Sequence, residues 1–364
     1  MNPKISICLP VYNQKELVSL FLKRLLQYQG DDIEIIINDD NSTDDILSIV
    51  NGFNDQRIKY FKNETNLGHD LNIISCFKHC STNYAYLFRT RDYPLVESID
   101  KIVETLQEHK DISFLTGGAI YEDGKQRFAY KGTITTDSKE CLELHKKVYI
   151  HPSGFVYNLS LLDIDRLENF IKNNAPHKYG FLVHRIARIE LATHGGFCLL
   201  PFNTWVYSDT SLSKDKAVNA SKDKESIYSA KYELERARCE FLWIKEIGLD
   251  DEQKKSILPW IYEKYLFAVT WGLLTKNNDV ALQQHYSYKK EKVSVKQNTK
   301  RFNELAKATF EECGFSLPLY KKTKRKKTAK NNLYYSFRYC GVTLLKKLKM
   351  FRKVKNAHEK GTKI

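Results

Sequence analysis

Carboxylate and guanidinium groups follow two apolar stretches near the start of the sequence. Asp39 and Asp40 come directly after the stretch 33–38, and Thr90-Arg91-Asp92 comes just after the stretch 84–88. Carboxylate oxygens accept hydrogen bonds from sugar hydroxyls and from ring N–H groups, and a guanidinium group pairs with phosphate through two parallel contacts. These residue types therefore suit a ligand that carries a base, hydroxyl groups and phosphate.

The apolar stretches predict strands that alternate with helices over the first hundred residues. Strands are expected at 5–9, 33–38, 58–61 and 84–88, and helices at 16–28, 46–53 and 71–80. This alternation is typical of βαβ units and of a parallel sheet. Because ligands bind beyond the carboxyl ends of the strands in such sheets, the polar residues that follow these strands should lie along one edge.

Several residues at this edge have specific expected roles. Pro10 ends the first strand, and Tyr12 offers a face on which a nucleobase can stack, although packing at the edge of the core is the alternative. Asp40 is the preferred contact for the base, whereas Asp44 is expected to cap the helix that follows it. Gly68 can adopt φ > 0 and let the backbone approach a ligand. No GxGxxG pattern follows the first strand, which argues against a dinucleotide-dependent dehydrogenase.

Four local patterns occur in the order and spacing found in inverting family 2 glycosyltransferases, which adopt the GT-A fold. They are Leu9-Pro10-Val11-Tyr12-Asn13, Asn38 to Asp44, Asn66-Leu67-Gly68 with Asn72, and Tyr86 to Asp92. The chain resembles this family strongly over residues 4–100 and more weakly to residue 210. Beyond that point only a general similarity to capsule and teichoic-acid transferases is left.

The resemblance implies an α/β fold: a Rossmann-like GT-A domain with a mainly parallel central sheet, followed by a helical region and a basic amphipathic tail. It also implies transfer of a sugar, with inversion, from a UDP-sugar to a glycan or polyprenyl-linked acceptor in bacterial surface polysaccharide synthesis. The donor-binding residues that it implies are Pro10, Tyr12, Asn13, Asp39, Asp40, Asn66, Gly68, Asn72, Arg89 and Arg91.

The sequence departs from the family at Thr90-Arg91-Asp92, where relatives carry an acidic DxD-like cluster that binds a divalent cation. Asp92 is the one carboxylate left in this segment, so binding of Mg²⁺ or Mn²⁺ is expected to be weakened. Arg89 or Arg91 can instead offset charge on the leaving diphosphate. A third interpretation is a domain that binds the sugar nucleotide but does not catalyse transfer.

An inverting transferase needs a general base near the acceptor hydroxyl. The region where relatives often place an acidic pair has none here, so His177 is the expected base and His184 the second candidate. The alternatives are an exposed helix cap for His177 and a helix-surface position for His184. Asp92 completes the predicted catalytic set, and Ser153 and Gly154 are expected to line the acceptor side.

Three segments are expected along the chain. They are a GT-A domain at 1–210, with a donor half at 1–100 and an acceptor half at 101–210, a helical region at 211–318, and a tail at 319–364. In the acceptor half we expect strands at 112–115, 127–130, 154–157 and 197–200, and helices at 161–172 and 178–193. Pro259 is expected to break a helix of the helical region.

Positive charge is concentrated in the tail. The chain has 58 Lys and Arg against 44 Asp and Glu, of which sixteen and one lie at 319–364, so the tail carries +15 and the rest −1. Apolar residues at helical intervals between Leu333 and Phe351 fit an interfacial helix on an anionic membrane surface. A solvated tail and nucleic-acid binding are the alternatives, and the nearly neutral body argues against nucleic acid.

The cysteine pattern and the lengths of the apolar runs indicate the cellular compartment of the protein. Eight scattered cysteines without a CxxC pair fit reduced thiols better than disulfides or a zinc site. No apolar run reaches the ~20 residues that span a bilayer, and Met1 leads into a strand-like stretch without a signal-peptide pattern. We therefore expect a cytoplasmic protein bound peripherally to the inner face of the plasma membrane. The donor sugar, the linkage and the oligomeric state stay open.

Overall fold

The structure is a computed structural model in which the chain divides into two compact units, residues 1–224 and 225–364. It describes residues 3–148, 151–175, 182–208, 229–277, 291 and 294–316. The expected segment boundaries at 210 and 318, and the tail at 319–364, lie outside the described residues. They remain predictions.

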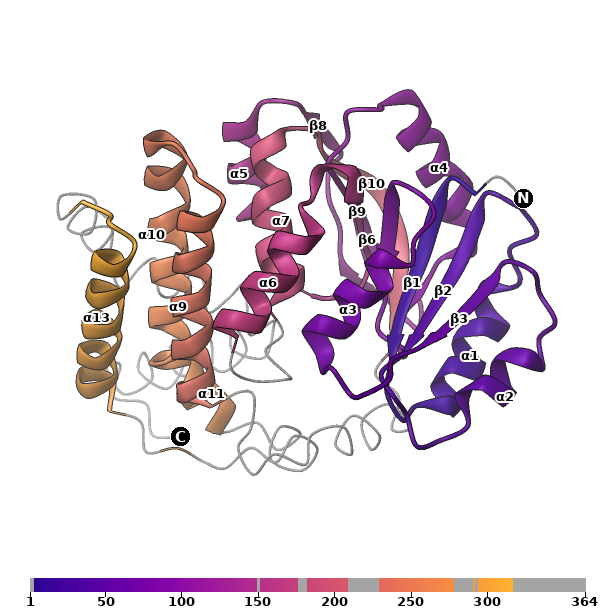
Figure 1. Ribbon diagram of the computed structural model, residues 1–364. Coiled ribbons are helices and arrows are strands. Elements are labelled where there is room, and N and C mark those ends of the chain that lie inside the picture. Colours follow the sequence, from indigo (N-terminus) through magenta and orange to yellow (C-terminus); the bar gives the residue numbers. More distant parts are fainter. Residues whose placement is uncertain are drawn as a thin grey trace, which may run out of the picture. The chain divides into compact units, whose positions relative to one another are not determined.

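The first unit is built on one mixed sheet (Figure 1). Its strands are β1 Ile5–Val11, β2 Ile33–Asp39, β3 Ile58–Lys62, β4 Tyr84–Leu87, β5 Tyr93–Pro94, β6 Phe114–Tyr121, β7 Gln126–Phe128, β8 Thr133–Thr135, β9 Phe155–Asn158 and β10 Phe197–Tyr207. The strand order is β3-β2-β1-β4-β9-β6-β10-β5, with β7 beside β6 and β8 beside β10. Following the chain, β2 and β3 are added on one side of β1, whereas β4 is added on its other side. Open α/β sheets bind ligands at such a switch point, which here lies between β1 and β4.

The longest pairings in the sheet are parallel, as predicted. β3, β2, β1 and β4 are parallel to one another, and so are β6 and β10. β9 lies antiparallel between β4 and β6. Consequently β9 begins at the edge where β1, β2, β4 and β10 end. Residues from five strands therefore reach one edge of the sheet.

Helices cover both faces of this sheet (Figure 1). They are α1 Lys15–Leu25, α2 Ile46–Asn51, α3 His69–Lys78, α4 Ile99–Glu108, α5 Ser138–His145, α6 Ile164–Asn174 and α7 Val183–His194, with single 3-10 turns at Val96–Ser98 and Leu159–Leu161. α1, α2 and α4 share one apolar core with the sheet, whereas α3 packs against β1, β2, α6 and α7 on the other face. The result is a layered α/β/α arrangement, which confirms the predicted fold class.

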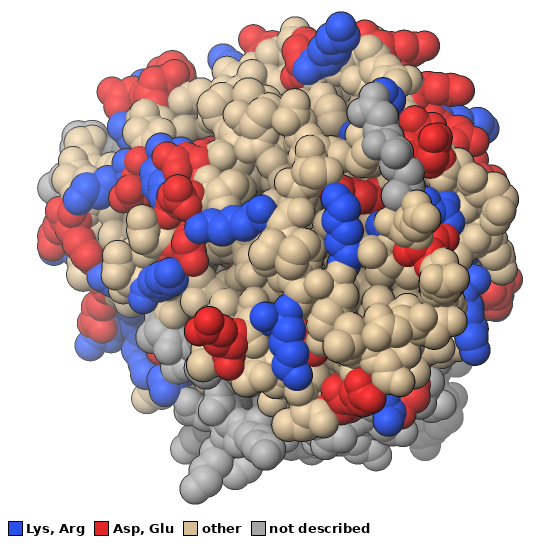
Figure 2. Space-filling model, turned by 45° about the vertical axis from the view of Figure 1, so that its right-hand side comes forward, with Lys and Arg blue, Asp and Glu red and all other residues tan. Residues whose placement is uncertain are grey.

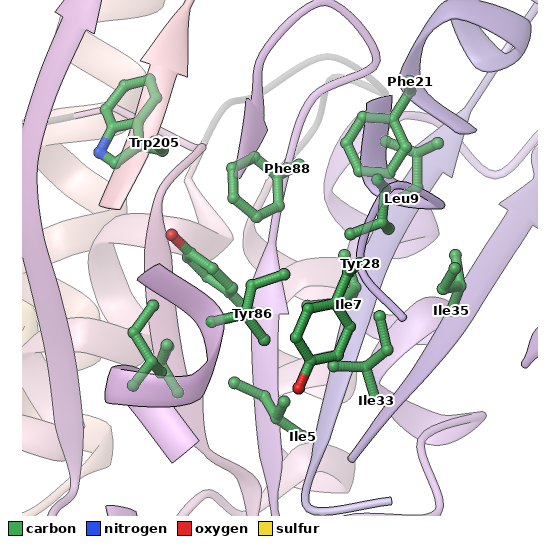
Figure 3. Packing of buried hydrophobic residues seen from close by; sticks show 14 of the residues in the cluster. Ile5, Ile7, Leu9, Phe21, Tyr28, Ile33, Ile35, Tyr86, Phe88 and Trp205 are labelled. Carbon is green, nitrogen blue, oxygen red and sulfur yellow. The ribbon is translucent and has the colours of Figure 1, made fainter. Parts of the chain in front are cut away.

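Successive side chains of each strand point to opposite faces of the sheet, so both faces receive apolar residues. Ile5, Ile7 and Leu9 of β1 point into the core with Phe21 of α1 (Figure 3), whereas Cys8 lies on the α3 side. Strands that are buried on both faces are apolar nearly throughout, which is why these stretches are easy to find in the sequence. On the face seen in Figure 2, acidic and basic side chains are interspersed, in keeping with the nearly balanced charge of the body.

Two strands of the acceptor half differ from the prediction. The strand expected at 112–115 begins at Phe114 and runs to Tyr121, through a Gly-Gly pair that favours a break. A Cβ at Gly117 would lie 2.4 Å from the Thr204 side chain, so glycine allows β6 and β10 to approach closely. The strand expected at 197–200 continues to Tyr207, because the exposed Pro201 lies in an irregular part of the β6–β10 pairing.

The second unit is helical where it is described. Its helices are α9 Ala230–Glu246, α10 Asp251–Ala268, α11 Trp271–Asn277 and α13 Val295–Glu312, and α9 packs against α10 and α13. The predicted break at Pro259 is wrong, since α10 runs through it. Proline removes only its own N–H donor, and the capping box of Asp250 with Gln253 and the burial of Pro259 stabilise this helix. Among the described residues no helix is long and apolar enough to cross a membrane.

Candidate active site

The carboxyl ends of β1 and β4 and the start of β9 meet at one edge of the sheet. Asp40 donates its backbone N–H to the Val11 carbonyl at 2.9 Å, and Gly154 donates its own to the Leu87 carbonyl at 2.9 Å. The hydroxyl of Thr90 hydrogen-bonds the side chain of Gln14, which joins the loops after β4 and β1. The polar residues that follow the strands therefore gather along one edge, as the sequence predicted.

Asp39 is fully buried and organises the loop after β2. One carboxylate oxygen accepts the Ser42 backbone N–H at 2.8 Å and also the Ser42 hydroxyl. The other accepts the Tyr60 hydroxyl at 2.6 Å. Burial, with the hydrogen bond to Asp39, raises the pKa of Tyr60, so this tyrosine stays a protonated donor. Asp39 thus fixes the loop that holds Asp40.

Asp40 is also buried, and it holds the start of α3. Its carboxylate accepts the backbone N–H groups of Leu67 at 2.7 Å and Gly68 at 2.8 Å, and the side-chain amide of Asn63 at 3.0 Å. Gly68 is the N-cap residue of α3 with φ of 86°, the positive value expected from the sequence. The structure therefore gives Asp40 a positioning role, and its contact with a base stays a prediction.

The other predicted donor residues lie in the same group of loops. Asn72 donates to the Val11 carbonyl at 3.3 Å and accepts the Asn38 amide at 2.6 Å, so it joins α3 to β1 and β2. Asn66 donates to the Asp40 carbonyl at 3.3 Å. Asn13, at φ of 52°, accepts the Thr43 backbone N–H at 2.8 Å. Pro10 and Tyr12 are half-buried beside them.

One capping prediction in this region is wrong. Asp44 was expected to cap the helix after it, but it accepts the backbone N–H of Lys15 at 2.9 Å, in the first turn of α1. Asp45 caps α2 instead, by accepting the Ser48 backbone N–H at 3.0 Å. The two acids are adjacent in sequence, and only the position of the β1 loop decides which helix each one serves.

Asp92, the acid left in the segment after β4, is fully buried and paired with Arg89. One carboxylate oxygen of Asp92 accepts Arg89 Nε at 3.0 Å, Arg89 Nη2 at 2.9 Å and the Ser153 hydroxyl at 2.7 Å. The other oxygen accepts the Ser208 backbone N–H at 3.3 Å. Ser153 also accepts the backbone N–H of Arg89 at 2.9 Å. Three segments of the chain, around Arg89, Ser153 and Ser208, therefore hold this carboxylate in place.

His151 lies against the same arginine. Its Nε2 is 2.5 Å from Arg89 Nη2, and its Nδ1 is 3.1 Å from the Ser153 backbone N–H. Nδ1 thus accepts the Ser153 backbone N–H, and Arg89 contacts the other ring nitrogen. Burial lowers the pKa of His151 well below its usual value, and the charges of Arg89, Arg91 and Arg127 lower it further. The imidazole is therefore neutral beside these guanidinium groups.

Gly154 explains how His151 fits at this edge. Its φ is 86°, and a Cβ on it would lie 2.2 Å from the indole nitrogen of Trp205. Glycine is therefore required for the approach of β9 to Trp205, whose ring stacks with the His151 imidazole at a centroid distance of 5.2 Å. The predicted acceptor residues Ser153 and Gly154 thus lie next to Asp92, and their contact with an acceptor stays a prediction.

Two further arginines lie on one aromatic ring at the end of β10. The Arg127 guanidinium carbon is 3.6 Å from the ring centroid of Tyr207, and that of Arg91 is 5.5 Å from the same centroid. Arg127 also donates from Nη1 to the hydroxyl of Tyr121 at 2.8 Å. Both arginines are half-buried. They place two positive charges beside the Asp92 cluster.

The segment after β4 does not fit a divalent cation. Such cations require several oxygen ligands, carboxylates above all. Thr90 offers only a hydroxyl, already bonded to Gln14, and Asp92 is saturated by Arg89 and Ser153 on one oxygen. In the part of the chain that the structure describes, no three His, Cys, Asp or Glu side chains form a group that could hold a metal ion. The ligands that relatives use are replaced here by a guanidinium-rich cluster.

Of the two candidate bases, the structure describes His184 but not His177. His177 lies outside the described residues, so its role stays a prediction. His184 is in the first turn of α7 and is buried, so the alternative of a helix-surface position for it is wrong. Its charge also contributes to lowering the pKa of His151, which places it within electrostatic reach of the Asp92 cluster.

Sequence reasoning did not single out His151, Arg127, Trp205 or Tyr207. No local pattern in the sequence links these residues to Asp92, because the segments that meet here are far apart along the chain. The backbone N–H that Asp92 accepts at the end of β10, for example, belongs to a residue 116 positions further on. The predicted end of that strand at 200 also left Trp205 and Tyr207 without a place in the sheet. The antiparallel direction of β9 would have pointed to His151, but pairing direction is not visible in a four-residue strand.

Known proteins resemble parts of this chain. Over 64 residues, 17% of this chain and 21% of the relative, it is 41% identical to the GalNAc(5)-diNAcBac-PP-undecaprenol beta-1,3-glucosyltransferase of Campylobacter jejuni. Over 114 residues, 30% of this chain and 34% of the relative, it is 31% identical to the abequosyltransferase RfbV of Salmonella typhimurium. The chain therefore spans about a fifth to a third of the length of these relatives.

A solved structure covers more of the chain. The fold resembles that of residues 1–349 of S. aureus TarS in complex with UDP-GlcNAc, with a TM-score of 0.60 and 14% sequence identity over 98% of this chain and 92% of that one. At this identity the likeness concerns the fold alone, and it agrees with the predicted GT-A class. Residues 6–164 match the sequence model of glycosyl transferase family 2.

Proposed function

We propose that this protein transfers a sugar, with inversion, from a UDP-sugar to a glycan or lipid-linked acceptor in the synthesis of a bacterial surface polysaccharide. The observation that carries the proposal is that Asp40 and Thr90 each bond the end of β1 or the loop after it, at the switch point between β1 and β4, within the region that matches family 2. One loop suits a nucleoside and the other suits a diphosphate, which are the two parts of a nucleotide donor.

For the donor, we place the uridine between Tyr12 and the loop that Asp39 and Asp40 fix. Tyr12 is half-buried and supplies a ring on which a base can stack. Asp40 holds the Leu67 and Gly68 backbone in position and provides carboxylate oxygens beside it. The UDP-GlcNAc in the TarS complex supports a uridine diphosphate donor.

For the acceptor, we place the sugar hydroxyl near Ser153 and Gly154. The Campylobacter relative carries an undecaprenyl diphosphate-linked glycan in its name, which supports a lipid-linked acceptor. The acceptor hydroxyl attacks the anomeric carbon as its proton passes to a general base, and the bond from that carbon to the diphosphate breaks. His177 is our first candidate for this base and His184 the second, and neither has to hold a metal.

A lipid-linked acceptor gives the basic segment 319–364 a use. Its charge of +15 and its apolar residues fit attachment to the cytoplasmic face of an anionic membrane. Sedimentation with vesicles containing phosphatidylglycerol compares the full chain with a chain that ends at residue 318. Equal sedimentation of the two at low salt would contradict a membrane role for this segment.

The experiment that tests the function uses the full chain with a panel of UDP-sugars and short polyprenyl diphosphate-linked glycans. We expect UDP release that depends on the acceptor, with a product of inverted anomeric configuration by NMR. His177→Ala should lower the transfer rate by about 10²–10⁴-fold and leave UDP affinity nearly unchanged; if only His184→Ala does so, the base is His184. UDP binding without any transfer across the panel would instead favour an inactive sugar-nucleotide-binding domain.

A further inference from the structure

We propose that Asp70 is a positioning residue for the transfer reaction, because it fixes the start of α7, where His184 lies, relative to the edge of the sheet where β1 and β4 end. The inference rests on the proposed function and deepens it. Of the two candidate bases it concerns His184, which the structure describes. Asp70 lies in the first turn of α3, between the predicted donor residues Gly68 and Asn72.

The carboxylate of Asp70 joins one helix to the start of another. Both of its oxygens accept the backbone N–H of Leu182 at 3.0 Å, and one of them also accepts that of Val183 at 3.2 Å. Leu182 is the N-cap residue of α7, and its own side chain makes no capping hydrogen bond. The first N–H groups of a helix have no partner inside the helix, and a negative charge beside them is favourable. Asp70, which is 2% exposed, therefore caps α7 from a different helix.

The turn that carries Asp70 is itself fixed to the strands of the donor half. Asp40 accepts the backbone N–H of Gly68, the N-cap residue of α3, at 2.8 Å. Asn72, two residues after Asp70, donates to the Val11 carbonyl at the end of β1 at 3.3 Å. These bonds hold the first turn of α3 against the loops after β1 and β2. The start of α7 is therefore tied, through Asp70, to the strand ends where the donor is proposed to bind.

A second contact of α7 leads to the acceptor side. The hydroxyl of Tyr157 in β9 donates to the His184 carbonyl at 3.4 Å. β9 begins directly after Ser153 and Gly154, the proposed acceptor residues. The charge of His184 also contributes to lowering the pKa of His151, which lies beside them. The start of α7 is thus attached to the donor half through α3 and to the acceptor side through β9.

A general base depends closely on its position. It must reach the acceptor hydroxyl at a hydrogen-bond distance of about 2.6–3.2 Å. A displacement of about 1 Å that arises far from the reacting atoms can lower the rate by about 100-fold. Without the Asp70 carboxylate, the N–H groups of Leu182 and Val183 lose their acceptor, and the first turn of α7 loses the contact that fixes it. We therefore expect the loss of Asp70 to slow transfer while donor binding stays intact.

The test measures the transfer rate and the UDP affinity of the full chain, with the UDP-sugar and acceptor that the panel identifies. Asp70→Ala should lower kcat by about 10–100-fold and change the affinity for UDP by less than about threefold. Asp70→Asn keeps one oxygen that can accept the Leu182 N–H, so it should recover part of the lost rate. Hydrogen exchange should become faster in the peptide that contains Leu182 and Val183 when Asp70 is replaced by alanine.

A double variant tests whether Asp70 acts through His184. If it does, the double variant Asp70→Ala with His184→Ala should be no slower than His184→Ala alone, because a base that is absent cannot also be displaced. A purely structural role for Asp70 would instead multiply the two single effects. Multiplied effects would therefore overturn the inference, and so would a His184→Ala variant that keeps the original rate.

Asp163→Ala is the matched control, because Asp163 caps the neighbouring helix α6 by accepting the Arg166 backbone N–H at 2.9 Å. It should lower Tm by about 2–4 °C, as the loss of a helix cap does, and leave the transfer rate unchanged. If Asp70→Ala does not fold, Asp70→Asn serves in its place in both the single and the double variant. An unchanged rate in the folded Asp70 variant, or a UDP affinity that falls as far as the rate, would overturn the inference alone. Absence of transfer by the original protein across the whole panel would overturn the proposed function as well.

Discussion

Asp92 in the first unit and Glu240 in the second are both fully buried carboxylates with basic partners. Glu240 has two partners on one neighbouring helix, α10: Lys264 Nζ lies 2.7 and 2.5 Å from its two oxygens, and the Tyr265 hydroxyl is 2.5 Å from one of them. The partners of Asp92 come from loops and strand ends that are far apart in the sequence. Among them an arginine and a serine, Arg89 and Ser153, share one oxygen.

The difference between the two carboxylates lies in the exposure of their basic partners. Lys264 is 4% exposed, so the Glu240 pair is closed to solvent. Around Asp92, Arg89 has 24% of its side chain exposed, and Arg91 and Arg127 add further positive charge. A buried pair that is closed to solvent can stabilise or specify a fold but cannot reach a ligand, whereas a partly exposed arginine beside Asp92 can. Burial of an acid is therefore no guide to function unless its surroundings are counted.

The largest expected effect comes from breaking the closed pair. Glu240→Gln leaves Lys264 buried without its counter-charge, which should lower the free energy of unfolding by about 3–5 kcal/mol. Chemical denaturation measures this change. The double variant Glu240→Leu with Lys264→Met should recover most of the loss, because an apolar pair avoids the cost of desolvating charges. A single variant as stable as the original protein would contradict a buried ion pair here.

A smaller effect is expected from Asp92→Asn. Arg89 loses its counter-charge but is partly solvated, so the loss in free energy of unfolding should be about 1–3 kcal/mol. The transfer rate should also fall, because Arg89 and Ser153 lose the carboxylate that holds them together. Ser153→Ala, which removes one hydrogen bond to the same Asp92 oxygen, is the matched control for the stability change. Loss of UDP binding in Asp92→Asn that is specific to Mg²⁺-containing buffer would point back to a metal ligand.

The smallest effect concerns the pH dependence of stability. The pKa of His151 is lowered in the folded protein, so unfolding takes up a proton once the pH falls below the ordinary histidine value of ~6.5. The stability that His151 contributes is thus present above pH ~6.5 and is lost as the pH falls below it, by about 1 kcal/mol at pH 5.5. His151→Gln should reduce this dependence.

The comparison between His151→Gln and the original protein isolates one histidine. Burial also lowers the pKa of His79 and His194, and these act in the same direction. Both residues are present in the two proteins, so their contributions cancel in the difference between the two pH profiles. Thermal unfolding followed between pH 7.5 and 5.5 measures this difference. Parallel profiles would mean that burial and the arginines around His151 do not hold it neutral.

Residues near the ends of the first strands could be placed from the sequence alone. The apolar stretches predict β1, β2 and β4, because strands that are buried on both faces are apolar nearly throughout. The helices between them predict that these strands are parallel. Asp39 and Asp40 had to lie at the carboxyl edge, and Gly68 had to be the residue with positive φ. What these acids contact was not predictable, because Asp40 bonds the Leu67 and Gly68 backbone of a loop that could have taken several courses.

The sequence by itself determined the α/β class, the family domain and the loss of an acidic cluster at Thr90-Arg91-Asp92. These depend on local spacing and residue type. Only the tertiary structure decided that Asp92 is paired with Arg89 and that Arg127 lies on Tyr207 beside it. The reason is physical: the antiparallel course of β9 and the continuation of β10 past Pro201 bring distant segments to one edge, and strand direction and strand length depend on long-range pairing.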